Sequence, residues 1–179
     1  ALPIYDPLLE RAKRDNVDWK VLAESQVALF QRDMTALHIL PPNLYLTVSE
    51  TIDLVIDGMK ILKDKNLVYE IDGDIYYDIS THLNSLPIPV DEALKIFAER
   101  GGDPERKKKR HPLDPVLWRK NVPGEPGWES PFGFGRPGWH IECSVIALNG
   151  STSLTGPVLD MQGGGTDLDR KSTRLNSSH

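Results

Sequence analysis

The chain has 179 residues, of which 39% are hydrophobic and 26% charged, with 26 acidic against 21 basic side chains. This balance is typical of a globular protein rather than a disordered tail, and the net charge of -5 gives no general reason to expect nucleic-acid binding. The sequence has neither the long apolar run of a membrane helix nor the pattern of a signal peptide, so we expect a cytoplasmic protein. The single cysteine, Cys143, excludes an internal disulfide.

Two helices are predicted near the start of the chain. Asp6 and Pro7 begin the first, because aspartate caps free backbone amides and proline suits the first helical position; we expect it to end near Asn16. Asp18 caps a longer helix that ends before Pro41. Its apolar residues at helical spacing, interpreted as packing surface, are Leu22, Leu29, Phe30, Met34 and Leu37.

A third helix and a hairpin follow. Thr47 and Glu50 form a capping box that predicts a helix start at Thr47. The stripe Ile52, Val55, Ile56, Met59 and Leu62 is also interpreted as packing surface. Residues 67–79 read as a two-stranded ribbon, since Asp72 and Gly73 suit the positive φ values of a tight turn between β-branched and aromatic segments.

A fourth helix is predicted over residues 91–100, closed by Gly101 and Gly102 because glycine adopts the left-handed cap conformation at little cost. The basic run 106–110 follows. Two interpretations remain open for it: a solvated loop, or contact with a phosphate or an acidic partner.

Nine of the eighteen residues from 122 to 139 are Gly or Pro, which excludes a helix or a central strand. The interleaved Trp128, Phe132 and Phe134 favour an ordered loop pinned to a surface. We then expect a helix over 140–148, a buried strand over 158–161 and a turn at 163–165. Residues 170–179 break with the preceding composition and are excluded from the fold.

Cys143 falls on the predicted helix within the segment WHIEC. A lone cysteine is most often a small buried hydrophobe, and the alternative is a metal ligand. His140 and Glu142 do not complete a site with it, because residues two apart on a helix point in different directions. The glycine run before Thr166 and Asp167 is either a plain turn or a place where a nucleotide approaches the backbone.

The segments GRPGWHIECSVIAL (135–148) and DMQGGGTDL (160–168) resemble the cysteine-activating branch of the class I aminoacyl-tRNA synthetases. That branch contains cysteinyl-tRNA synthetase and the ATP-dependent ligase of mycothiol biosynthesis. ERGGDP at 99–104 is similar to a signature block of the ligase. The resemblance spans nearly all of residues 6–168 and favours the ligase.

The resemblance implies an α/β fold: part of the Rossmann-like catalytic core of class I synthetases, with an inserted helix-plus-hairpin connective region. On this basis we expect residues 1–110 to form a helical segment and the connective region. Residues 111–169 are expected to form the C-terminal part of the split core, and residues 170–179 a non-native tail.

The resemblance also implies ligands and site residues. Cys143 matches a zinc-ligand cysteine, Trp139 matches the tryptophan beside the bound cysteinyl adenylate, and Gly165, Thr166 and Asp167 match the triplet that contacts this adenylate. The implied cofactors are Zn²⁺ and ATP with Mg²⁺. The implied substrates are cysteine, ATP and glucosaminyl-inositol, joined by an amide bond. No catalytic residue is assigned.

Other family elements are absent from this sequence: the first zinc cysteine, the HIGH-type motif, the zinc histidine and the KMSKS-type loop. Residues 1–5 also depart from the family pattern. We therefore expect the 179-residue chain to be inactive by itself. Two alternative functions stay open. One is cysteinyl-tRNA synthetase, with tRNA as the acceptor; the other is a non-catalytic binding module whose basic residues 107–110 engage an acidic partner.

Overall fold

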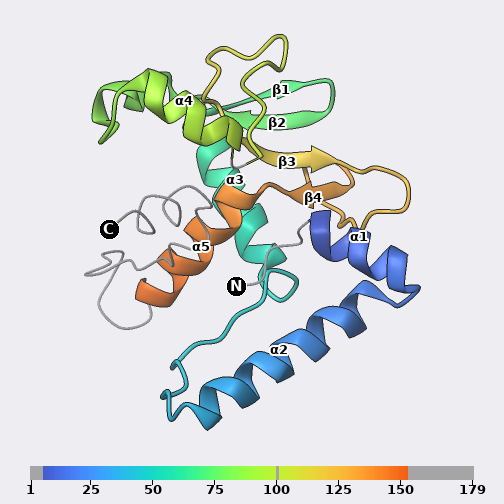
Figure 1. The fold of residues 1–179 in the computed structure, drawn as a ribbon. Helices are drawn as coiled ribbons and strands as arrows, with labels where there is room; N and C mark the ends of the chain where they lie inside the picture. The colour runs from blue at the N-terminus through green and yellow to red at the C-terminus, as the bar shows by residue number, and fades with distance from the viewer. Residues whose placement is uncertain (1–5, 100, 153–179) are drawn as a thin grey trace.

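Short strands form one antiparallel sheet in the order β1-β2-β3-β4, and helices lie beside and below it in the view of Figure 1. This computed structural model describes residues 6–99 and 101–152. The helices are α1 (Asp6–Asp15), α2 (Trp19–Ala36), α3 (Ile52–Asp64), α4 (Val90–Glu99) and α5 (Trp139–Thr152), with a 3-10 helix at Ile79–Ser85. The strands are β1 (Val68–Ile71), β2 (Asp74–Tyr77), β3 (Val116–Lys120) and β4 (Gly135–Pro137).

The predicted hairpin is confirmed, but it belongs to a larger sheet. Asp72 and Gly73 take φ values of 55° and 99° at the turn between β1 and β2. β3 then pairs antiparallel with β2, and β4 pairs antiparallel with β3. The sheet therefore has more strands than the predicted two-stranded ribbon. α4 lies between β2 and β3 in the sequence, and a local sequence pattern does not encode pairing over such a separation.

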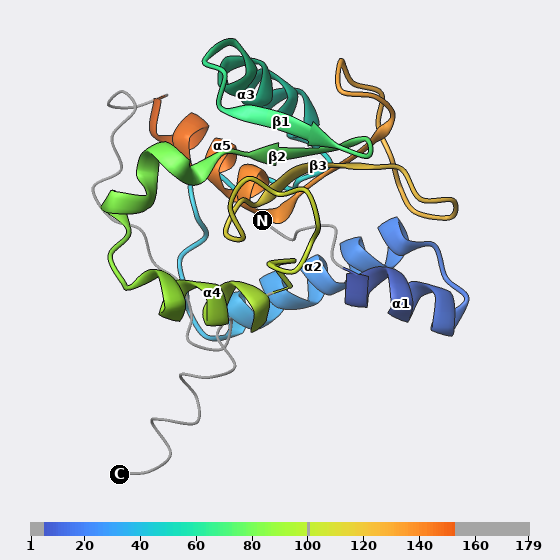
Figure 2. The ribbon, with the colours of Figure 1, turned by 90° about the horizontal axis from the view of Figure 1, so that it is seen from above.

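The core lies where α3 and α5 meet the sheet. Its buried residues are Val48, Ile52, Val55, Ile56, Met59, Ile75, Leu117, Trp118 and Ile141. The predicted apolar stripe of α3 is thus confirmed as packing surface, with Leu62 partly buried against it. Figure 2 shows α3 and β1 on one side of the fold and α2 on the other.

The start of α3 differs from the prediction. Glu50 Oε2 accepts hydrogen bonds from the Thr47 backbone amide (3.0 Å) and the Thr47 hydroxyl (2.6 Å), so the expected Thr47–Glu50 pair exists. The Thr47–Glu50 pair closes a turn that precedes the helix and is not part of it. The Thr51 hydroxyl donates to the Thr47 carbonyl (3.0 Å), and the helix begins at Ile52.

α2 begins as predicted: the Asp18 carboxylate accepts from the backbone amides of Lys20 and Val21. Its apolar stripe is not the packing surface that we expected. Leu22 is buried, but the exposed fractions of Leu29, Phe30 and Leu37 are 40%, 49% and 65%. The reason is positional, because α2 extends away from the sheet and its main described contacts are with α1 (Figure 1).

The predicted end of α4 is confirmed. Gly101 has a φ of 82°, and the Gly102 amide donates to the Phe97 carbonyl over 2.8 Å, which is the six-residue bond of a Schellman cap. The Gly/Pro-rich segment is ordered as expected. Trp128 exchanges two backbone hydrogen bonds with Gly135, and Trp128 and Phe132 pack against the core, whereas Phe134 is exposed.

The pairing of β2 with β3 joins residues on both sides of position 110, where the sequence places a domain boundary. That division stays a prediction. The described strands are all antiparallel, and the strand predicted over 158–161 lies outside the described residues.

Candidate functional site

Trp139 and Cys143 lie one helical turn apart on the exposed side of α5. Residues at i and i+4 share a helix face, so the two side chains have a common surface. Trp139 is 38% exposed and Cys143 is exposed as well. The expectation of a buried, hydrophobic cysteine is therefore wrong, while the metal-ligand interpretation stays a prediction.

The opposite face of α5 fixes this orientation. Ile141 is buried in the core, and Val145 packs against Gly58 of α3, where an added Cβ would lie 2.6 Å from Val145 Cγ1. The entry to α5 is equally constrained: a Cβ at Gly138 would lie 2.1 Å from the Val116 carbonyl oxygen. Only glycine permits that approach, and the Gly138 amide donates to the Leu117 carbonyl over 2.8 Å.

Glu142 points inward, away from Cys143. It is 2% exposed, and its Oε2 atom accepts no hydrogen bond from the described residues. Burial raises the pKa of Glu142 to about 8, and the positive charge of Arg136 offsets this only in part. His140, by contrast, is on the exposed side. The two side chains therefore point in different directions, as their spacing predicts.

Cys143 is the described residue that the resemblance assigns to zinc. Partial desolvation, together with the negative charge of Glu142, raises the pKa of its thiol. Among residues 6–99 and 101–152, no group of three or more His, Cys, Asp or Glu side chains could hold a metal ion. The described residues therefore do not form a complete zinc site by themselves.

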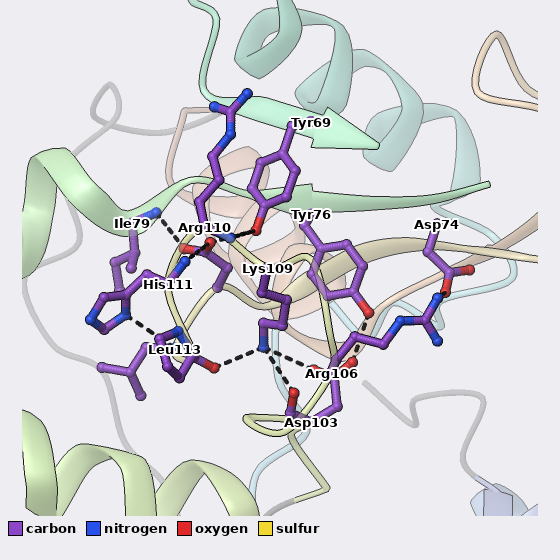
Figure 3. A network of polar contacts seen from close by, with 12 residues as sticks. Tyr69, Asp74, Tyr76, Ile79, Asp103, Arg106, Lys109, Arg110, His111 and Leu113 are labelled. Carbon is purple, nitrogen blue, oxygen red and sulfur yellow. Dashed lines mark hydrogen bonds and ion pairs between the residues drawn. The ribbon is translucent and has the colours of Figure 1, made fainter. Parts of the chain in front are cut away.

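The loop 101–115, which contains the basic run, brings polar side chains together with others from β1 and β2 (Figure 3). Asp114 is fully buried and accepts hydrogen bonds from the Tyr69 hydroxyl and from the backbone amides of Ile79 (2.9 Å) and His111 (2.8 Å). The Arg110 amide in turn donates to the Tyr69 hydroxyl over 3.0 Å. Asp114 thus ties the loop to β1 and to the 3-10 helix.

The basic run 106–110 contacts carboxylates of its own chain. Lys108 pairs with Asp72 at 2.6 Å and Arg110 with Asp78 at 2.8 Å. Arg106 lies 3.5 Å from both Asp72 and Asp74. The side chains of Lys108 and Arg110 nevertheless stay 67% and 55% exposed, so these ion pairs stabilise the loop only weakly, and both interpretations of the run stay predictions.

The contacts of Tyr69 and Tyr76 with this loop make the stability of the fold fall at alkaline pH. Burial first, and then hydrogen bonds to Asp114 and Asp103, raise the pKa of Tyr69 and Tyr76 above the ordinary value. A group whose pKa is higher in the folded state stabilises the fold below its unfolded pKa, about 10 for tyrosine, and that stabilisation is lost as pH rises beyond it. We expect absorbance titration to show these phenols ionising together with unfolding. Complete ionisation of all five tyrosines in the folded protein would contradict this.

The remaining predicted site residues, Gly165, Thr166 and Asp167, lie outside the described residues. The structure therefore brings together two of the five site residues predicted from sequence. Asp114 was missed by the sequence reasoning, and Lys109 was considered only as a member of the basic run 106–110.

Comparison with protein families identifies the class. Residues 3–170 match the family described as tRNA synthetases class I (C) catalytic domain. The chain belongs to this family, which confirms the expected class of fold. ATP use is implied by the family. Within the described residues, no helix is both long and apolar enough to cross a membrane.

Comparison with individual curated proteins gives more specific matches than the family does. The chain is 48% identical over 184 residues to the L-cysteine:1D-myo-inositol 2-amino-2-deoxy-alpha-D-glucopyranoside ligase of Frankia casuarinae, covering 98% of this chain and 38% of the relative. It is 46% identical over 179 residues to the protein of the same name from Thermomonospora curvata, covering 98% and 42%. For Streptosporangium roseum the identity is 48% over 171 residues, covering 94% and 41%. The chain thus spans about two fifths of the length of these relatives.

Proposed function

We propose that this chain is part of an ATP-dependent ligase that activates cysteine and joins it to the amine of glucosaminyl-inositol. The observation that carries the proposal is the common exposed face of Trp139 and Cys143 on α5. An aromatic wall one turn from a thiol can hold a small amino acid and contribute to its selection. The names of the relatives support the same substrates.

The proposed reaction has two steps. The cysteine carboxylate attacks the α-phosphorus of ATP, pyrophosphate leaves, and cysteinyl-AMP forms. The acceptor amine then attacks the acyl carbon, the bond to AMP breaks, and an amide forms with loss of a proton. Neither step requires a covalent intermediate with the enzyme, so catalysis depends on positioning and on stabilisation of the developing charge.

We assign Trp139 to the wall beside the cysteinyl adenylate, and Gly165, Thr166 and Asp167 to direct contact with it. Cys143 is the residue that would hold Zn²⁺, with further ligands from outside the described residues. When bound there, zinc would favour cysteine over serine, because a soft thiolate coordinates it strongly and a neutral hydroxyl does not. Mg²⁺ would accompany ATP.

Transfer to tRNA is the alternative in the same family, and the assay below separates the two acceptors. The non-catalytic binding module is less favoured, because three of the four cations expected to engage an acidic partner, Lys108, Lys109 and Arg110, are paired within the chain.

The test is to produce the protein from its complete reading frame and to measure cysteine-dependent exchange of pyrophosphate into ATP. We then expect an amide product with glucosaminyl-inositol and no acylation of cysteine tRNA. Acylated tRNA without amide would favour the synthetase. Absence of cysteine-dependent exchange from a folded, zinc-loaded protein would contradict both enzymes.

A further inference from the structure

Lys109 is a buried cation in the loop 101–115. Its side chain is 2% exposed, and its ammonium group donates to Asp103 Oδ1 (3.0 Å), to the Asp103 carbonyl (3.2 Å) and to the Pro112 carbonyl (2.8 Å). A lysine ammonium has three protons, so these acceptors use all of them. Lys109 is therefore held in a single place rather than extending into solvent as most lysines do.

Two aromatic rings complete this environment. The Lys109 ammonium lies 4.8 Å from the centre of the Phe97 ring and 5.5 Å from that of Tyr76. The Tyr76 hydroxyl donates to Asp103 Oδ2 over 2.7 Å, which links the ion pair to β2 (Figure 3). Both rings are within the distance at which a cation is attracted to an aromatic face. The Asp103–Lys109 pair thus anchors Phe97, at the end of α4, to the sheet.

Phe97 in turn contacts the beginning of α5. A Cβ added to Gly102 would lie 2.5 Å from the Phe97 ring, so the ring fills the space against this glycine. The rings of Phe97 and His140 are stacked, with centres 6.4 Å apart and planes at 23°. His140 follows Trp139 directly and lies in the turn that carries Trp139 and ends at Cys143.

We propose that Lys109 and Phe97 are positioning residues for the cysteine end of the site. The Asp103–Lys109 pair holds Phe97, Phe97 holds His140, and the first turn of α5 keeps Trp139 in the orientation that receives the amino acid. Neither residue needs to touch substrate. The expected effect on cysteine binding rests on the proposed function. The expected effect on the first turn of α5 rests only on the contacts described above.

The variants are Lys109→Met, which keeps the length of the side chain but removes its charge, and Phe97→Leu, which removes the ring. Lys108→Met is the matched control, because Lys108 is an exposed neighbour whose described ion pair is with Asp72. Phe97→Tyr keeps the ring and should restore wild-type behaviour. All are made in the protein from the complete reading frame, and Phe97→Leu decides the question if Lys109→Met does not fold.

Kinetics give the first readout. We expect Lys109→Met and Phe97→Leu to raise KM for cysteine in pyrophosphate exchange about tenfold, with KM for ATP and kcat within about twofold of wild type. Folded variants with an unchanged KM for cysteine would overturn the inference. Equal increases in KM for cysteine and ATP would also overturn it, since they indicate general loosening of the fold.

Hydrogen exchange gives a readout that does not depend on activity. The amides of residues 143–146 donate to the carbonyls of the first turn of α5, so faster exchange there reports opening of that turn. We expect at least tenfold faster exchange in the two variants than in Lys108→Met. Unchanged hydrogen exchange would refute the positioning role, whether or not the wild-type protein has cysteine-dependent activity. A wild-type protein without cysteine-dependent activity would refute the proposed function, which is a separate result.

Discussion

Replacing Cys143 by alanine in the protein from the complete reading frame is expected to abolish stoichiometric zinc binding. We also expect cysteine-dependent pyrophosphate exchange to fall by about a hundredfold or more, because loss of one ligand from a four-coordinate site removes both affinity and geometry. Discrimination between cysteine and serine should fall with it. In the metal-free protein, stability should change by less than about 0.5 kcal/mol, since Cys143 is exposed and its truncation creates no core cavity.

Ser144→Ala is the matched control for this experiment. Ser144 is the exposed neighbour of Cys143, and its hydroxyl donates to the His140 carbonyl within the same helix over 2.8 Å. It should keep both zinc and activity. Metal analysis that finds one zinc per chain in Cys143→Ala would contradict the ligand assignment, as would unchanged selection of cysteine over serine.

The elements of this fold that depend on local chemistry could be predicted from the sequence. Asp18 caps α2 because its carboxylate reaches the next free amides, and Asp72 with Gly73 turns the hairpin because both tolerate positive φ. The same reasoning places a helix across Cys143. The spacing of Trp139 and Cys143 places both on one face of that helix. Which face of α5 is exposed follows only from its packing against α3.

What the sequence did not predict depends on contacts between distant residues. Trp118 of β3 pairs with Ile75 of β2, although α4 lies between the two strands in the sequence. No local sequence pattern encodes that register. Phe30 on α2 reads as a core residue by periodicity, yet it is exposed, because periodicity identifies an apolar face without showing what covers it. The basic run is a similar case, since its role depends on which carboxylates the hairpin brings to it.

Asp114→Ala is expected to destabilise the protein by about 3–5 kcal/mol, a large part of the stability of an ordinary domain. The carboxylate is fully buried and accepts from two backbone amides and the Tyr69 hydroxyl. Alanine leaves these donors without an acceptor in a place that water reaches poorly. Asp114→Asn should also be destabilising, because an amide nitrogen would then face one of the donors.

Urea unfolding measures this effect, with Asp57→Ala as the control. Asp57 is an exposed carboxylate on α3 whose described partner is Lys60, and its loss should cost less than about 0.5 kcal/mol. Tyr69→Phe removes one of the donors, so Asp114→Ala combined with it should be less destabilising than the sum of the two changes, by about 1 kcal/mol. An Asp114→Ala midpoint equal to that of Asp57→Ala would show that the 101–115 loop contributes little to the fold. In that case its hydrogen bonds would follow from the packing of α3 and α5 rather than support it.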